Sequence, residues 1–427
     1  MPIPTISHSG TLVAETAPLS AKSRISLPIK LLLLYLLVEF GRPQDSLPLL
    51  GVLQFPMLIL LSLGVQVAKS RVPKFTDRTT KLFVTLLIFM LFHVPFAVNN
   101  FWAFHTARAM ALTFIGYLGI LTFVDSPRAF RTLITAWLAI HVYLATSGLM
   151  HGGVGIGGWI GDENDFCLVL NMVLPYAYFM TFCDDNVGKK IMHIGMVVLF
   201  LAAIMATFSR GGFLGLLAVG LYCWFRSSRK IISGFVIFLF ALFLIYFAPK
   251  GYWEEMSTIQ KEYSGEVVGT GADREYEWEI GQKMFLANPL FGIGQGNFPW
   301  EFSNYEGEDT FEGRSRAGRA AHSLYYTLLP ELGLFGVFLF LGMNYYIYKD
   351  LAVVRRLYKE KRKRVDRGEA RFLFYSACAL EASLIGYLVS GYFISVLYYP
   401  SFWILMGFAV TLRKVALAND EKSIAAH

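Results

Sequence analysis

The sequence predicts an all-α protein that crosses a membrane many times and carries one large loop on the outer side. Its composition is 55% hydrophobic and only 16% charged, which no ordinary soluble domain shows. Apolar runs close to twenty residues long recur along the chain, and a helix of that length crosses a bilayer core about 30 Å thick. The runs are apolar throughout and do not alternate, which excludes a transmembrane β-barrel.

About twelve spans are predicted from these apolar runs. They lie at residues 27–41, 47–68, 82–98, 104–124, 132–150, 165–183, 191–208, 211–225, 231–248, 323–348, 372–396 and 399–412. The eighth and twelfth are short for a full crossing, so tilted or broken helices are expected there. The chain thus divides into nine spans over 27–248, a polar loop over 249–322 with short helices, and three spans over 323–412.

The orientation follows from the distribution of Lys and Arg, which favour cytoplasmic connections. Residues 349–371 form a strongly basic block. Counting spans from this block places four more basic connections on the same side, namely 69–81, 126–131, 189–190 and 226–230. Both tails, 1–26 and 413–427, are then cytoplasmic, and the acidic 249–322 loop faces outward. The first tail lacks the apolar stretch of a signal peptide. Membrane topology explains the net charge of +7, so no nucleic-acid partner is expected.

Two features inside the spans indicate packing. The four cysteines have no CxxC spacing and no histidine at ligand spacing, so we interpret them as buried thiols, without disulfides or a metal. They are Cys167, Cys183, Cys223 and Cys378. The pair Gly211 and Gly215 opens the eighth span with GxxxG spacing and predicts close helix contact.

The first candidate site element is the segment 207–212, Thr-Phe-Ser-Arg-Gly-Gly, between the seventh and eighth spans. Arg210 lies at the outer interface, where a desolvated cation is costly without a partner. Its guanidinium fork suits a phosphate or pyrophosphate. The alternative without a functional role is an arginine whose side chain extends to the lipid headgroups.

The second element begins with Arg274 and Trp278. Residues 274–286 predict a short amphipathic helix, which Asn288-Pro289 ends. Glycines at 292, 294 and 296 then form a turn that leads to Asn297. This turn is not a dinucleotide fingerprint, because no strand precedes it and the spacing fails. An ordinary salt bridge on a surface helix is the alternative role of Arg274.

The third element is His322 at the entry to the tenth span. A histidine of near-neutral pKa at this position can serve as a general base, although a lone interfacial histidine is more often structural. Glu331 lies about two turns deeper and needs a polar partner there, which suits a supporting role. Arg108, near the outer end of the fourth span, is a further candidate for phosphate contact.

A fourth element is the glycine-rich connection 151–165, which ends in Asp162-Glu163-Asn164-Asp165. Its carboxylates are oxygen ligands of the kind that divalent cations use, but their spacing matches no EF-hand. A contact with substrate is the expected role.

In their order, spacing and common side, these motifs resemble the O-antigen ligase and polysaccharide polymerase superfamily of bacterial envelope proteins. The resemblance covers about residues 160–340, from Asp-Glu-Asn-Asp through Ser-Arg-Gly-Gly and Arg-x-x-x-Trp to Ala-His-Ser-Leu-Tyr and Glu-Leu-Gly-Leu-Phe-Gly. It implies a protein of the bacterial inner membrane with its active site facing the periplasm. The donor would be a glycan on undecaprenyl pyrophosphate, and the acceptor a hydroxyl of a glycan, lipid or protein.

The resemblance also implies roles for individual residues. Arg210 and Arg274 would contact the pyrophosphate, and His322 would lie beside the acceptor hydroxyl. A group of further residues is expected to bind substrate: Arg108, Arg314, Arg316, Arg319, Trp278, Asn297 and Glu331. Trp278, with Trp300 and Tyr305, offers faces for sugar stacking. No metal or cofactor is expected, since arginines can stabilise the departing pyrophosphate. Inversion at the anomeric carbon is a hypothesis.

Three alternatives remain open at this stage. A polymerase of the same superfamily uses the same donor and differs in its acceptor. A transporter or flippase would carry charged or broken segments at mid-membrane in paired spans, whereas the candidate residues here collect on one face. A scaffold without catalytic activity would tolerate changes at Arg210, Arg274 and His322.

Overall fold

The computed structural model describes residues 26–72, 75–227, 230–231, 234–235, 270–307, 315, 317–361 and 368–425, and every regular element in these segments is helical. The α-helices are α1 (Leu27–Leu36), α2 (Pro43–Ser46), α3 (Pro48–Val52), α4 (Phe55–Lys69), α5 (Arg78–His93), α6 (Asn100–Phe123), α7 (Pro127–Met150), α8 (Glu163–Met180), α9 (Val187–Ala206), α10 (Arg210–Arg226), α13 (Thr270–Ala287), α14 (Phe298–Glu306), α15 (Leu324–Lys361), α16 (Gly368–Ser390) and α17 (Pro400–Ala425). Short turns of 3-10 or π helix are η1 (Leu37–Gly41), η2 (Val94–Phe96), η3 (Gly158–Ile160) and η4 (Gly391–Phe393).

Seven helical segments of the described chain are long and apolar enough to cross a membrane. They are Arg78–Phe96, Asn100–Phe123, Pro127–Met150, Val187–Ala206, Leu324–Lys361, Gly368–Phe393 and Pro400–Lys422. The apolar helix α4 is shorter, because the chain turns at the left-handed Gln54, just before Pro56, and so divides the expected 47–68 span into α3 and α4. Helices α8 and α10 fall where spans are expected, and the ninth expected span lies mostly outside the described residues. The count of twelve therefore stays a prediction.

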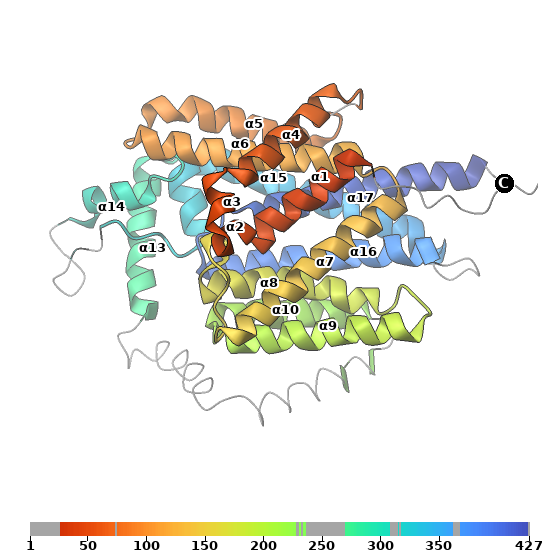
Figure 1. Cartoon of the computed structure of the whole chain (residues 1–427). Coiled ribbons are helices and arrows are strands. Elements are labelled where there is room, and N and C mark those ends of the chain that lie inside the picture. Colours follow the sequence, from red (N-terminus) through yellow and green to blue (C-terminus); the bar gives the residue numbers. More distant parts are fainter. Residues whose placement is uncertain are drawn as a thin grey trace, which may run out of the picture.

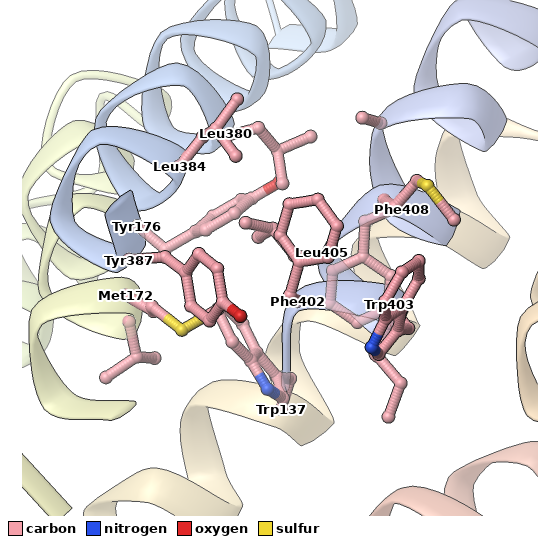
Figure 2. Packing of buried hydrophobic residues seen from close by; sticks show 14 of the residues in the cluster. Trp137, Met172, Tyr176, Leu380, Leu384, Tyr387, Phe402, Trp403, Leu405 and Phe408 are labelled. Carbon is pink, nitrogen blue, oxygen red and sulfur yellow. The ribbon is translucent and has the colours of Figure 1, made fainter. Parts of the chain in front are cut away.

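Most of the long helices lie side by side in a bundle, and α13 crosses one end of it, opposite the C-terminus (Figure 1). Helix α8 is buried along nearly its whole length. Aromatic side chains of four helices meet around it in Figure 2, including Trp137 of α7, Tyr176 of α8, Tyr387 of α16 and Phe402 of α17. All four cysteines are buried, as predicted.

Close packing at the GxxxG pair is also confirmed. A Cβ on Gly211 would lie 2.9 Å from Phe393, and one on Gly215 would lie 2.0 Å from the Ser390 hydroxyl oxygen. Only a glycine permits α10 to approach the end of α16 this closely. The first turn of α10, which begins at Arg210, thereby lies against Phe393 in the connection that follows α16.

The predicted basic connections gather at one end of the bundle. There Arg131 pairs with Asp184 at 3.4 Å. Glu381 of α16, which is buried, pairs with Arg226 of α10 at 3.2 Å and Arg355 of α15 at 2.7 Å. No local sequence signal marks Glu381, because burial of its carboxylate depends on helices distant in the chain.

The predicted outer connections gather at the opposite end, which carries α13. Their contacts join segments that are far apart in the sequence. They include Asn99 with Asn297, Trp159 with Glu39, Ser209 with Asn164, and Tyr399 with Asp165. The bundle therefore separates the two predicted sets of connections, although the side that faces the cytoplasm stays a prediction.

Helix α15 differs in two ways from the expected 323–348 span. It continues through Lys361, into the predicted basic connection, and its backbone breaks at Gly333, where φ is +60° and ψ is −167°. This region of backbone space is almost restricted to glycine. The break divides α15 into a short outer part, which follows His322, and a long part through the bundle.

Candidate functional site

The break in α15 is filled by the glycine turn of the large loop. The amides of Ile293 and Gly294 donate to the carbonyls of Pro330 and Glu331, at 2.8 and 3.0 Å. In return, the amides of Leu334 and Phe335 donate to the carbonyls of Pro289 and Leu290, at 2.8 and 3.0 Å. Backbone groups released by the break thus find partners, as the membrane interior requires.

The side chain of Glu331 completes this junction. Its carboxylate is 2% exposed and accepts hydrogen bonds from the amides of Gly296 at 2.7 Å and Phe298 at 2.9 Å. The hydroxyl of Tyr398 donates to the same carboxylate at 2.7 Å. Three donors offset the cost of burying a carboxylate. Glu331 therefore holds the glycine turn against α15, and its polar partners are now identified.

Helix α13 lies where the sequence predicts a short helix, and it begins four residues earlier than expected. The indole of Trp278 donates to the carbonyl of Ala321 at 2.9 Å, and its ring stacks on Tyr326 at 5.0 Å. Trp278 thus fixes the backbone directly before His322, and Tyr326 covers one face of its ring.

His322 has an unusual backbone conformation, with φ of +44°, which few non-glycine residues adopt. Its side chain is exposed, yet surrounding protein lowers the pKa of His322 below its ordinary value, and the charges of Arg274 and Arg319 lower this pKa further. Asp162 opposes the shift. A histidine of lowered pKa is neutral at neutral pH and can accept a proton.

The cations beside His322 are held by the first turns of α13. Arg319 pairs with Asp273 at 3.4 Å and with Glu277 at 3.5 Å. Burial raises the pKa of Glu277 to about 7, although Arg319 and Arg274 act in the opposite direction. Arg274 therefore acts electrostatically on both Glu277 and His322, and the cluster joins α13 to the segment that precedes α15.

Arg210 is brought to the same end by the start of α10. Ser209 caps this helix by accepting from the amide of Gly212 at 3.0 Å, and its hydroxyl donates to Asn164 at 2.7 Å. Asn164 belongs to the glycine-rich connection 151–165, and so does Asp162, whose charge acts on His322. This connection therefore links the Arg210 region to the His322 region.

The other predicted substrate-binding residues have different surroundings. Asn297 is fully buried, and its side-chain oxygen accepts from the amide of Asn99 at 2.7 Å, so it joins the glycine turn to the start of α6. Arg108 lies on the exposed side of α6. Arg314 and Arg316 lie outside the described residues. The ring of Trp300 is 49% exposed and stacks on Trp102.

No sequence motif marks the connection between α16 and α17, residues 391–399. Two of its tyrosines donate to acidic groups at the end of the bundle that carries α13, Tyr398 to Glu331 and Tyr399 to Asp165. The predicted topology puts this connection on the outer side, but its partners are more than sixty residues away in the chain. Only the packing of the helices identifies it.

A cavity of about 350 Å³ lies at the opposite end of the bundle. Its lining consists of Thr76, Asp77, Arg78, Thr79, Tyr346, Lys349, Asp350, Val353 and Arg413. None of the predicted site residues contributes to this cavity, so it is separate from the candidate site.

Comparison with known proteins agrees with the motifs. Curated proteins gave no match. The sequence model of the O-antigen ligase family matches residues 195–341, about a third of the chain. The matched region contains Arg210, Arg274, His322 and Glu331, and it supports a ligase- or polymerase-type membrane enzyme of surface polysaccharide biosynthesis. Residues 195–341 are therefore similar to the O-antigen ligase domain, which supports the resemblance to the O-antigen ligase-like superfamily.

Proposed function

We propose that the chain transfers a glycan from undecaprenyl pyrophosphate to an acceptor hydroxyl at the periplasmic face of the bacterial inner membrane. The observation that carries this proposal is the cluster of Arg274, Arg319 and His322 beside the Arg210 region, inside the O-antigen ligase domain. Such a cluster combines anion binding with a group that can accept a proton.

The arginines are assigned to the leaving group. A pyrophosphate carries several negative charges, and guanidinium groups stabilise the charge that develops as the bond to the sugar breaks. Arg210 and Arg274 are the proposed principal contacts. Arg319, which pairs with Asp273 and Glu277, is a proposed additional contact. The lipid tail would extend along the apolar helices.

His322 is assigned to the acceptor. Its lowered pKa keeps the imidazole neutral, so it can take the hydroxyl proton as the acceptor oxygen forms a bond to the anomeric carbon. The bond between that carbon and the pyrophosphate oxygen breaks in the same step, and the electron pair leaves with the pyrophosphate. A single displacement inverts the anomeric configuration.

The ligase and polymerase activities share this chemistry and differ in the acceptor. A ligase transfers the glycan to a different molecule, and a polymerase transfers it to another repeat unit. The transporter alternative needs charged groups at mid-membrane in paired spans, whereas the candidate residues gather at one end of the bundle. We therefore place the two enzymatic activities first.

The test is to delete the gene and restore it with wild type, His322→Ala, Arg210→Ala or His105→Ala. His105 is also an exposed histidine, on α6, and serves as the matched control. We expect the first two variants to reach the membrane, to fail in glycan transfer and to accumulate lipid-linked donor, while His105→Ala behaves as wild type. Normal surface glycans from both site variants would contradict the proposal. The missing conjugate would separate ligase from polymerase.

A further inference from the structure

The 391–399 connection contacts the site helices α10, α13 and α15 and the acidic stretch that opens α8, although it lies outside the region matched by the O-antigen ligase family. Tyr392 meets Trp278 of α13, and Phe393 lies against Gly211 at the start of α10. Ser395 accepts a hydrogen bond from Thr327 of α15 at 3.2 Å. Together with the two tyrosine–carboxylate bonds described above, these contacts make the connection one side of the site.

Tyr392 is the exposed aromatic residue of this side. Its ring meets the edge of Trp278 at 5.2 Å, with 78° between the planes, and lies 5.9 Å from the ring of Tyr325. The residue nevertheless keeps 40% of its surface exposed. Trp278 also bonds to the carbonyl before His322. An exposed tyrosine therefore packs against the tryptophan that holds the backbone directly before the proposed base.

The neighbouring aromatic rings are already engaged inside the protein. Trp278 and Tyr326 stack on each other with 3° between their planes, and the hydroxyl of Tyr325 donates to the carbonyl of Leu388 at 2.9 Å. The sugar-stacking role expected for Trp278 is thus better suited to Tyr392, whose position Trp278 supports. A pyranose ring has an apolar face of C–H groups, which suits contact with such an exposed ring.

We infer that the 391–399 connection is a wall of the substrate site, and that the Tyr392 ring binds a pyranose ring of the glycan beside His322. The inference rests on the proposed function, since it assigns a subsite for the same substrate. It makes Tyr392 a binding residue, which affects the affinity for glycan more than the rate of the chemical step.

The experiment measures transfer by the full-length protein in detergent or liposomes, with wild type, Tyr392→Phe, Tyr392→Trp and Tyr392→Leu. Phe and Trp keep an aromatic face, whereas Leu keeps only an apolar side chain. We expect Leu to raise KM for the glycan about three- to tenfold with little change in kcat. Phe and Trp should stay near wild type. Thermal unfolding of each variant checks that the fold is retained.

Each result has a distinct meaning. Equal KM values for Leu, Phe and wild type, with intact folding, would overturn the inference and leave the proposed function standing. The same holds if Leu lowers only thermal stability, as expected of a lipid-facing anchor. No transfer by the wild-type protein with any lipid-linked glycan would instead contradict the proposed function itself.

Discussion

His322 combines a left-handed backbone with a ring whose pKa is lowered by its surroundings. The backbone conformation costs about 1–3 kcal/mol and persists only when neighbouring contacts hold it. Here the indole of Trp278 holds the carbonyl of Ala321 on one side, and α15 begins on the other. The backbone conformation of the residue at the centre of the proposed chemistry thus depends on tertiary contacts.

The charges around His322 predict a specific pH dependence. A neutral imidazole is required, so activity should fall as pH drops through the pKa of His322. Arg319→Gln removes a cation that lowers this pKa, so the acid limb of the pH–rate profile should move to higher pH. Asp162→Asn removes the carboxylate that raises this pKa and should move the limb to lower pH.

The profile of kcat/KM against pH, recorded for both variants and wild type, provides the check. Asparagine at 162 can still accept the hydrogen bond that caps α8, so the substitution removes the charge while the helix cap is kept. Shifts in the same direction for both variants would contradict the assigned electrostatics, whatever the activity of each.

At the scale of elements, the junction between the glycine turn and α15 joins the large loop to the bundle. Four backbone hydrogen bonds and the carboxylate of Glu331 join the segment 289–298 to the break at Gly333. A broken membrane helix normally leaves unpaired backbone groups. Since the loop supplies their partners, the fold of the loop and the fold of α15 depend on each other.

Gly333→Ala tests this junction. A Cβ at residue 333 would lie 2.6 Å from the carbonyl of Leu290, and φ is +60°. The substitution should therefore destabilise the protein by about 2–5 kcal/mol. Gly220→Ala is the control, because that glycine lies in α10 with nothing within 4 Å of the added carbon. Thermal unfolding in detergent measures both, and a comparable loss of Tm in the two variants would contradict the argument.

The motifs of this junction were visible in the sequence, but their pairing was not. The glycines at 292, 294 and 296 predict a turn, and Glu331 predicts a polar partner within the membrane helix. Nothing in the spacing indicates that the two satisfy each other, because hydrogen-bond partners thirty or more residues apart are set by packing. Tyr398, the third partner of Glu331, carries no local signal at all.

At the scale of the whole molecule, the bundle separates two sets of polar connections to opposite ends. One end holds the basic connections and the buried Glu381 pairs. The other holds α13, the glycine turn and His322. Because the long bundle helices cross from one set to the other, the alternation predicted from Lys and Arg corresponds to a physical separation in the structure.

Cysteine labelling tests which end faces the periplasm. All four native cysteines are buried, so they should react slowly with a membrane-impermeant maleimide. Ser303→Cys adds an exposed thiol on α14, and Val187→Cys adds one at the opposite end, where Val187 is 67% exposed. In intact spheroplasts we expect rapid labelling of the first variant only. Lysis should expose the second. The reverse pattern would invert the predicted orientation.

By itself the sequence determined the helical membrane fold, the places of most long helices and the elements that bear the candidate site. It did not show the division of the 47–68 span into α3 and α4 or the extension of α15 and α17 beyond the expected spans. Apolar length and Lys/Arg bias are local properties, so each can be recognised within one stretch of chain. The tertiary structure decided which candidates lie together. It brought Arg319 beside Glu277, gave Glu331 its three donors, buried Asn297 and placed Tyr392, Tyr398 and Tyr399 against the elements of the candidate site. These relations depend on helices meeting across long sequence separations, where burial and hydrogen bonding are settled only once the bundle has formed.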